Sequence, residues 1–242
     1  MIILDGKKTA QDLKEEIKIS VASIRENNQR PPHLAAVIVG NDGASLTYVG
    51  SKVRSCEYVG FDSTLIQLEE STTEETLLEK IKELNQDANL DGYIVQLPLP
   101  KHIDEEKILL AIDPTKDVDG FHPSNFGRMA LEMDAFIPAT PFGIIELLER
   151  YKIETSGKHC VVVGRSHIVG RPISILMSQK GSVGNATVTV AHSRTENLAN
   201  LTRNADIVVM ALGIPGFLTA DMVKEGAVII DVGITRVSDD RH

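Results

Sequence analysis

The stretch that decides the fold is VVVGRSHIVGRP, residues 161–172, in which three valines lead into a glycine-rich turn. In an α/β sheet, a turn between a buried strand and the next helix binds a diphosphate through backbone N–H groups and the positive helix end. Gly164 and Gly170 are spaced more widely than in the usual Gly-x-Gly-x-x-Gly pattern. The turn therefore indicates a nucleotide site, with a purely conformational role of the glycines as the alternative.

The end of the next predicted strand gives information about the cofactor. NAD-binding sheets commonly place an acidic residue there to hold the ribose hydroxyls. This chain has AHSRTEN at residues 191–197, so Ser193 and Arg194 occupy that place. A hydroxyl and a guanidinium suit the 2′-phosphate of NADP, and Arg165 can add a second positive charge. NADP is thus favoured over NAD, and an ordinary polar loop is the alternative.

Apolar runs around this stretch alternate with helical patterns along most of the chain. Strands are predicted at HCVVVG, ATVTVAH, DIVVMAL and AVIIDVG, and in the N-terminal half at HLAAVIVG, STLIQLE and DGYIVQLPLP. Helices are predicted between them, including TADMVKEG near the end and one that Thr140 caps before Pro141. Residues 113–140 break the alternation with a loop rich in Pro, Gly, Asp and Asn.

This alternation predicts an α/β protein with mainly parallel sheets and helices on both faces. We expect two α/β domains, at residues 1–120 and 141–242, joined by an inter-domain segment at 121–140. The second domain is expected to be a Rossmann-like parallel sheet, with an active-site cleft between the domains.

Composition narrows the class of protein. The 242 residues carry a net charge of −9, which argues against a nucleic-acid partner or an anionic membrane surface. The two cysteines form no Cys-x-x-Cys pattern, so we expect no metal site and a reducing compartment. There is no signal-peptide pattern and no apolar run long enough to span a membrane. The chain is expected to be cytoplasmic.

A second candidate site lies in SLTYVGSK, residues 45–52. Ser45, Tyr48 and Lys52 recur at helical offsets and would share one face, either as a solvated stripe or as the wall of a site. Gln96 follows a predicted strand, at the sheet edge where ligands gather. A lysine that is partly desolvated there can transfer protons. Asp117 and Asp119, in KDVDGF, are either turn formers before Gly120 or functional carboxylates.

Six motifs occur in the order found in one known family. TYVGSK, VQLPLP, KDVDGF, PATPFG, GRSHIVGRP and DVGI resemble the bifunctional methylenetetrahydrofolate dehydrogenase/methenyltetrahydrofolate cyclohydrolase enzymes, over essentially the whole chain. The resemblance implies oxidation of 5,10-methylenetetrahydrofolate with NADP, followed by hydrolysis to 10-formyltetrahydrofolate. It also implies a homodimer, tetrahydrofolate derivatives as ligands, and a place in one-carbon metabolism and purine biosynthesis.

The resemblance also implies roles for individual residues. Lys52 would be catalytic, with Tyr48 packing on the folate rings and orienting it. Gln96 would tune the lysine, Asp119 would bind the pterin, and Ser45 would lie close by. The cofactor-side residues implied are Gly164, Arg165, Ser166, Gly170, Ser193, Arg194, Thr140 and Ile234.

The chain departs from the family pattern at its end, DVGITRVSDDRH. The resemblance implies several dozen further residues with a final helix, so we expect the C-terminal end to be missing. Three rival functions stay open from the sequence: a Rossmann-type oxidoreductase acting on another substrate, a monofunctional dehydrogenase, and a non-catalytic folate- or nucleotide-binding protein.

Overall fold

The computed structural model describes residues 2–235, which form two compact units. The first unit runs to Met129 and includes Asp134–Ile137, and the second contains Ala130–Met133 and the chain from Pro138 onward. The active-site cleft expected between them stays a prediction.

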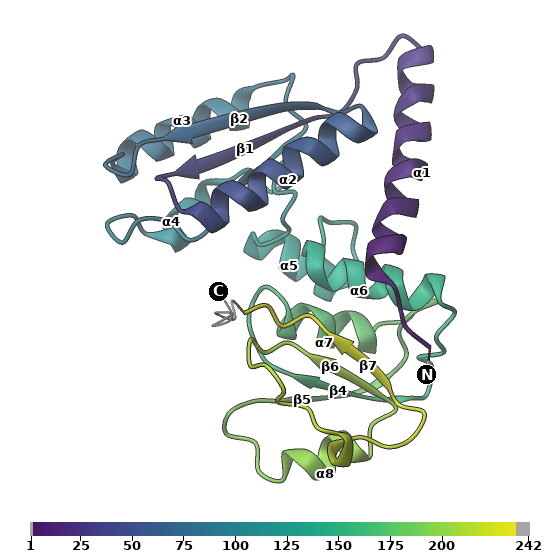
Figure 1. Ribbon diagram of the computed structural model, residues 1–242. Coiled ribbons are helices and arrows are strands. Elements are labelled where there is room, and N and C mark those ends of the chain that lie inside the picture. The colour runs from purple at the N-terminus through teal and green to yellow at the C-terminus, as the bar shows by residue number, and fades with distance from the viewer. Residues whose placement is uncertain (1, 236–242) are drawn as a thin grey trace, which may run out of the picture. The chain divides into compact units, whose positions relative to one another are not determined.

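The first unit is a three-stranded parallel sheet with helices on both faces (Figure 1). Its elements are α1 (Gly6–Glu26), β1 (His33–Val39), α2 (Gly43–Val59), β2 (Asp62–Leu68), α3 (Glu74–Gln86), β3 (Gly92–Val95), α4 (Glu105–Ala111) and α5 (Pro123–Ala130). The strand order is β2-β1-β3. The central strand β1 is buried along most of its length, which explains why its sequence is a continuous apolar run.

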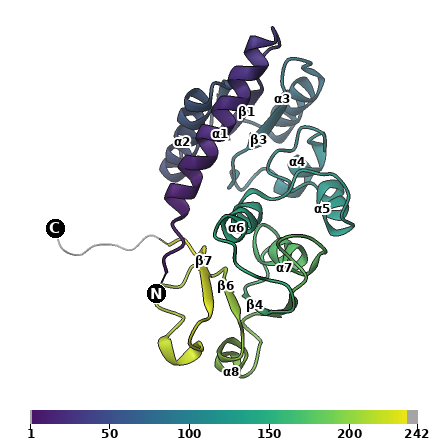
Figure 2. The ribbon, with the colours of Figure 1, turned by 90° about the vertical axis from the view of Figure 1, so that its right-hand side faces the viewer.

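Alternate residues of this sheet pack on different helices. Ala36 and Ile38 of β1 pack with Val49 of α2, whereas Ala35 and Val37 belong to the cluster that contains apolar residues of α3 and α4. Helix α1 lies against α2, away from the sheet (Figure 2). The sheet thus fixes α2, the helix that carries Tyr48 and Lys52.

The second unit is a four-stranded parallel sheet of order β5-β4-β6-β7. Its elements are α6 (Ala139–Arg150), β4 (His159–Val163), α7 (Gly170–Ser178), β5 (Thr187–Ala191), α8 (Leu198–Arg203), β6 (Ile207–Met210), a 3₁₀ turn η1 (Ala220–Met222) and β7 (Val228–Asp231). Helices α6 and α7 pack together, and α7 lies on β4 and β5. Apolar residues of α8 contact the cluster that contains Val161 and Val163 of β4.

The predicted α/β class, the parallel sheets and the two units are confirmed, whereas three local predictions are wrong. The segment expected to be loop contains α5, in which Asn125 and Met129 are buried. Thr140 is not a helix cap, because α6 begins at Ala139 after Pro138 and has no side-chain cap. The helix predicted at TADMVKEG is only the 3₁₀ turn η1.

Candidate active site

Helix α2 begins with a cap that uses Ser45. The Asp42 carboxylate accepts hydrogen bonds from the Ser45 backbone N–H at 2.8 Å and from its hydroxyl at 3.0 Å. Such a cap satisfies N–H groups that the first helical turn leaves unpaired. Ser45 is buried, so its hydroxyl serves the helix start directly. A contact of Ser45 with substrate stays a prediction.

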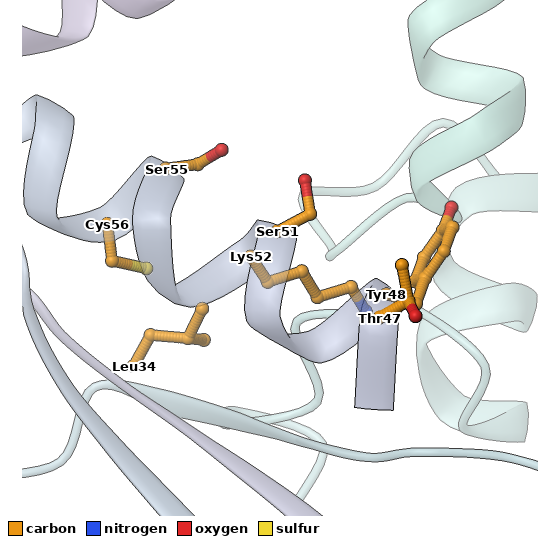
Figure 3. Close-up of a pocket in the computed structure, with 7 residues that line it drawn as sticks. All are labelled: Leu34, Thr47, Tyr48, Ser51, Lys52, Ser55 and Cys56. Carbon is orange, nitrogen blue, oxygen red and sulfur yellow. The ribbon is translucent and has the colours of Figure 1, made fainter. Parts of the chain in front are cut away.

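Tyr48 and Lys52 lie one turn apart on α2 and face the same way, as their spacing predicts. The Lys52 Nζ lies 5.4 Å from the centroid of the Tyr48 ring, within the range of a cation–π interaction. Figure 3 shows the lysine side chain running along α2 toward the tyrosine. More than half of the Tyr48 surface is exposed, at 56%, so its ring is available to stack on a planar ligand.

The second partner of Lys52 comes from a different part of the chain. The Asp119 Oδ1 lies 3.8 Å from the Lys52 Nζ, and both side chains are largely buried, at 24% and 30% exposure. Burial raises the pKa of Asp119, the Lys52 ammonium opposes this rise, and the Asp117 carboxylate adds to it. The structure therefore brings together two of the predicted site residues that are far apart in sequence.

Asp117, the other carboxylate of KDVDGF, forms the turn instead. It is buried, and its Oδ2 accepts hydrogen bonds from the His122 backbone N–H at 2.8 Å and the Asn125 amide at 2.9 Å. The Gly120 N–H donates to the Asp117 carbonyl at 3.1 Å. The alternative that Asp117 is a turn former is confirmed, while Asp119 is left to face Lys52.

Gln96 lies immediately after β3, with its backbone N–H bonded to the Val37 carbonyl of β1 at 2.9 Å. Its side-chain Nε2 donates to the Leu97 carbonyl at 2.8 Å, which fixes the orientation of the amide. Its Oε1 is buried and has no hydrogen-bond partner among residues 2–235. A buried acceptor without a donor costs about 1–3 kcal/mol, so this atom points to a donor on a ligand.

A pocket of about 500 Å³ adjoins the lysine on α2. It is lined by Leu34, Thr47, Tyr48, Ser51, Lys52, Ser55 and Cys56. Figure 3 shows Tyr48 and Thr47 at one end of this group, and Leu34 and Cys56 at the other. The row of hydroxyls at 47, 51 and 55 was not among the predicted site residues, although their spacing of four is a helical signal.

Cys56 does not add a nucleophile to this pocket. Burial raises the pKa of the Cys56 thiol, so the reactive thiolate is disfavoured at neutral pH. Cys56 and Leu34 therefore supply apolar surface, while Tyr48, Lys52 and the hydroxyls supply polarity. Such a lining suits a flat, partly aromatic ligand with polar edges.

The predicted cofactor turn in the second unit needs both of its glycines. A Cβ on Gly164, whose φ is +129°, would lie 2.5 Å from the Ala211 carbonyl oxygen. A Cβ on Gly170 would lie 2.3 Å from the Gly164 carbonyl oxygen. Real Cβ atoms do not come so close to backbone, so the turn closes tightly only with glycine at both positions.

Ser166 pairs the N–H groups at the start of the helix that follows this turn. Its hydroxyl oxygen accepts from the N–H groups of Val169 and Gly170 at 3.2 Å each, and its carbonyl accepts from Arg171. The first N–H groups of α7 are therefore already paired. In contrast, the N–H groups of residues 165–168 form no hydrogen bond within residues 2–235. The loop before the helix, more than the helix end itself, offers donors to a diphosphate.

The remaining cofactor-side predictions lie on exposed surface of the second unit. Ser193 and Arg194 follow β5 in a turn in which the Arg194 N–H donates to His192. Thr140 is in the first turn of α6, and Ile234, with 83% of its surface exposed, follows β7. Because the four strands are parallel, the ends of β4, β5 and β7 lie along one edge of the sheet, where nucleotides bind.

This turn fits the dinucleotide expected from the sequence. The tight glycine pair lets the backbone approach a diphosphate, and the unpaired N–H groups can donate to it. The exposed guanidinium groups of Arg165 and Arg194 suit a 2′-phosphate. Among residues 2–235, no three His, Cys, Asp or Glu side chains are grouped to hold a metal ion. None of the helices in that range has the length and apolar character to cross a membrane.

Two family models match the chain. Residues 4–119 match "Tetrahydrofolate dehydrogenase/cyclohydrolase, catalytic domain", and residues 138–242 match "Tetrahydrofolate dehydrogenase/cyclohydrolase, NAD(P)-binding domain". The first range holds Lys52, Tyr48, Gln96 and Asp119, and the second holds the glycine turn.

Curated relatives and solved structures agree with these models. The chain is 72% identical over 239 residues to Bifunctional protein FolD of Flavobacterium johnsoniae, covering 99% of this chain and 81% of the relative. The fold is similar to that of the bifunctional FolD enzyme from Campylobacter jejuni, with a TM-score of 0.94, 42% identity and coverage of 98% and 83%. It is also similar to the Trypanosoma brucei FolD complexed with NADP cofactor and inhibitor, with a TM-score of 0.92, 36% identity and coverage of 100% and 82%.

Proposed function

Because the chain belongs to the tetrahydrofolate dehydrogenase/cyclohydrolase family, we infer from the geometry above which side chains serve each of its two reactions. The enzyme oxidises 5,10-methylenetetrahydrofolate to the 5,10-methenyl cation with NADP, and then hydrolyses that cation to 10-formyltetrahydrofolate. The observation that carries the assignment of residues is the Lys52 ammonium held between the Asp119 carboxylate and the Tyr48 ring.

The oxidation depends mainly on orientation. NADP, when bound, supplies the acceptor for the hydride that leaves the methylene carbon. Gly164 and Gly170 shape the turn for its diphosphate, while Arg165, Ser193 and Arg194 hold the 2′-phosphate. Thr140 and Ile234 are proposed as further contacts of the cofactor. On the folate side, Asp119 accepts hydrogen bonds from the pterin amino and ring N–H groups, and Tyr48 stacks on the ring system.

The hydrolysis needs proton transfer. Water attacks the electrophilic methenyl carbon, and its oxygen loses both protons as the carbonyl forms. One proton is released to solvent and carries away the positive charge of the cation, and the other passes to the ring nitrogen as the carbon–nitrogen bond breaks. In this proposal Lys52 moves the proton between oxygen and nitrogen, and its ion pair with Asp119 holds the side chain in position. The unpartnered Gln96 Oε1 accepts a hydrogen bond from the lysine or from the attacking water.

The cellular setting is proposed on less direct grounds. We expect a cytoplasmic homodimer that supplies one-carbon units for purine biosynthesis. The two described cysteines, Cys56 and Cys160, are free and buried, which fits a reducing compartment. Size-exclusion chromatography with light scattering would test the dimer, and a monomer at micromolar concentration would refute it.

The roles of the residues are tested by absorbance-followed turnover of the purified chain with 5,10-methylenetetrahydrofolate and NADP. Lys52→Met should reduce hydrolysis by about 10²–10⁴-fold and let the methenyl intermediate accumulate, while NADP reduction continues. Lys80→Met, which removes a lysine of α3 that pairs with Glu83 on the same helix, is the matched control and should behave as wild type. Hydrolysis at the wild-type rate in Lys52→Met would show that Lys52 is not the proton-transfer group.

A further inference from the structure

A buried amide on α5 holds the loop that carries Asp119. Asn125 has only 4% of its surface exposed, and its Nδ2 donates both to the Pro114 carbonyl and to the Asp117 Oδ2, each at 2.9 Å. Both partners can only accept, so the orientation of the Asn125 amide is fixed by chemistry. One side chain thus ties together the two ends of the segment 114–117.

Asp117 connects the Asn125 amide to the turn that follows. It is 2% exposed, and its carboxylate has two donors, the Asn125 amide and the His122 N–H at 2.8 Å. Its carbonyl accepts from Gly120 at 3.1 Å, which closes the turn around Asp119. A buried carboxylate that loses one of two donors is costly to keep in place. The position of Asp117, and with it the turn, therefore depends on Asn125.

The opposite side of the loop rests directly on the sheet. A Cβ on Gly92 of β3 would lie 2.2 Å from the Val118 Cγ1, so Val118 packs against bare backbone. The Tyr93 N–H donates to the Lys116 carbonyl at 3.0 Å. Asp119 is thus placed by a loop held between Gly92 on one side and Asn125 on the other. The distance of 3.8 Å from Asp119 to Lys52 leaves little room for displacement.

We propose that Asn125 is a positioning residue for the folate site: its two hydrogen bonds set where the Asp119 carboxylate meets Lys52 and the pterin. The proposal rests on the proposed function and adds a specificity element outside the pocket lining. Asn125 acts through Asp117 and Asp119, so its loss should weaken folate binding and leave NADP binding unchanged.

The test uses two variants of the full chain, each also combined with Asp119→Asn. Asn125→Asp keeps the shape but removes both donors, and should raise the KM for the folate substrate about tenfold at pH 8 with an unchanged KM for NADP. Asn125→Ser keeps one donor and should raise it about threefold. A protonated carboxyl can donate again, so the ratio of Asn125→Asp to wild-type kcat/KM should recover as the pH is lowered. Within the Asp119→Asn background, neither change at Asn125 should raise the folate KM by more than about a further twofold.

The control for general destabilisation is Thr155→Val in the second unit. Thr155 is 1% exposed and its hydroxyl accepts from the Gly184 N–H at 2.9 Å, so the variant also loses one buried hydrogen bond. It should lower the Tm without raising the folate KM. If Asn125→Asp does not fold, Asn125→Ser decides the matter by the same comparisons.

Two outcomes would overturn the proposal: a wild-type folate KM in every folded Asn125 variant, or losses that simply add to those of Asp119→Asn. These outcomes are distinct from failure of the proposed function, because the latter would appear as absent folate turnover in the wild-type chain itself. A folate KM that rises and is coupled to Asp119 supports the proposal.

Discussion

Gly170→Ala is the change for which the structure predicts the most specific defect. The added Cβ would lie 2.3 Å from the Gly164 carbonyl oxygen, 2.6 Å from its carbonyl carbon and 2.8 Å from the Arg165 nitrogen. All three atoms are backbone, so no flexible side chain can give way. Helix α7 and the turn before it must therefore move apart.

The size of the effect follows from that overlap. An ordinary Cβ contact begins at 3.4 Å, so the two backbones must separate by about 1 Å. Overpacking of this kind costs about 1–3 kcal/mol of stability. A displacement of about 1 Å in a positioning element costs about 10²-fold in rate. Because the turn holds only the cofactor in our assignment, we expect the loss in kcat/KM for NADP.

The assay separates the two activities of one preparation. Dehydrogenase activity is followed by NADPH formation, and cyclohydrolase activity by the decay of added 5,10-methenyltetrahydrofolate, which requires no NADP turnover. Gly170→Ala should lower the dehydrogenase activity by about 10²-fold and keep the cyclohydrolase activity within about twofold of the wild type. Gly181→Ala is the control in the same unit, because its Cβ would make only an ordinary contact, at 3.7 Å from the Val183 carbonyl. An unchanged KM for NADP in Gly170→Ala, or an equal loss of both activities in a folded variant, would refute the assignment of the turn.

Two further predictions concern single charges. Burial raises the pKa of Asp119 above its ordinary value, so its ionised form is less favourable in the folded than in the unfolded chain, and stability is lost as the pH rises through the folded-state pKa. Asp119→Asn should therefore raise the Tm at pH 7, and this difference from the wild type should vanish in acid. The same variant should raise the folate KM about 10²-fold. A lower Tm at pH 7 in thermal unfolding would contradict the stability prediction. Arg194→Ala should raise the KM for NADP about 30-fold and the KM for NAD by no more than about twofold. Steady-state kinetics with both cofactors measures these values. An equal rise for NADP and NAD would show that Arg194 does not bind the 2′-phosphate.

The strands could be predicted because their burial is reflected in the local amino-acid sequence. Parallel strands that helices cover on both faces become continuous runs of β-branched residues. Strands β4 and β6 are almost wholly buried in this way, and β1 is similar. The glycine turn could be predicted for the same reason, since a strand, a glycine and a helix follow one another directly in sequence.

The helix boundaries were less predictable because tertiary contacts decide them. Helix α5 contains Gly127 and, in its first turn, Asn125; both are poor helix formers, and the sequence therefore resembles a loop. Burial of Asn125 and Met129, together with the bonds from Asn125 to the neighbouring loop, stabilises it in the folded chain. The cap expected at Thr140 was a sound local signal, yet α6 begins at Ala139 without any side-chain cap.

The candidate site likewise has one part that local sequence predicts and another part that depends on tertiary contacts. Helical spacing predicts that Tyr48 and Lys52 share a face, because both lie on one element. The pairing of Lys52 with Asp119 depends instead on the strand order β2-β1-β3, which brings the segment after β3 beside the helix after β1. Without the resemblance to a known family, the sequence offered no signal for that pairing, nor for the buried amide of Asn125.

Two unfavourable features of the first unit lie where its chemistry is expected. The Gln96 Oε1 is a buried acceptor without a donor in the described chain, and the Asp119 carboxyl has a raised pKa because it is buried. Each lowers the stability of the folded chain, and neither is needed to build the sheet. The nearby buried polar groups Asp117 and Asn125, in contrast, are paired with each other. An attacking water carries the O–H donor that the Gln96 Oε1 lacks, and a pterin carries N–H donors that would stabilise the ionised Asp119 carboxylate beyond its pairing with Lys52. A ligand would therefore relieve both unfavourable features, which is the arrangement expected of a binding site and not of a structural core.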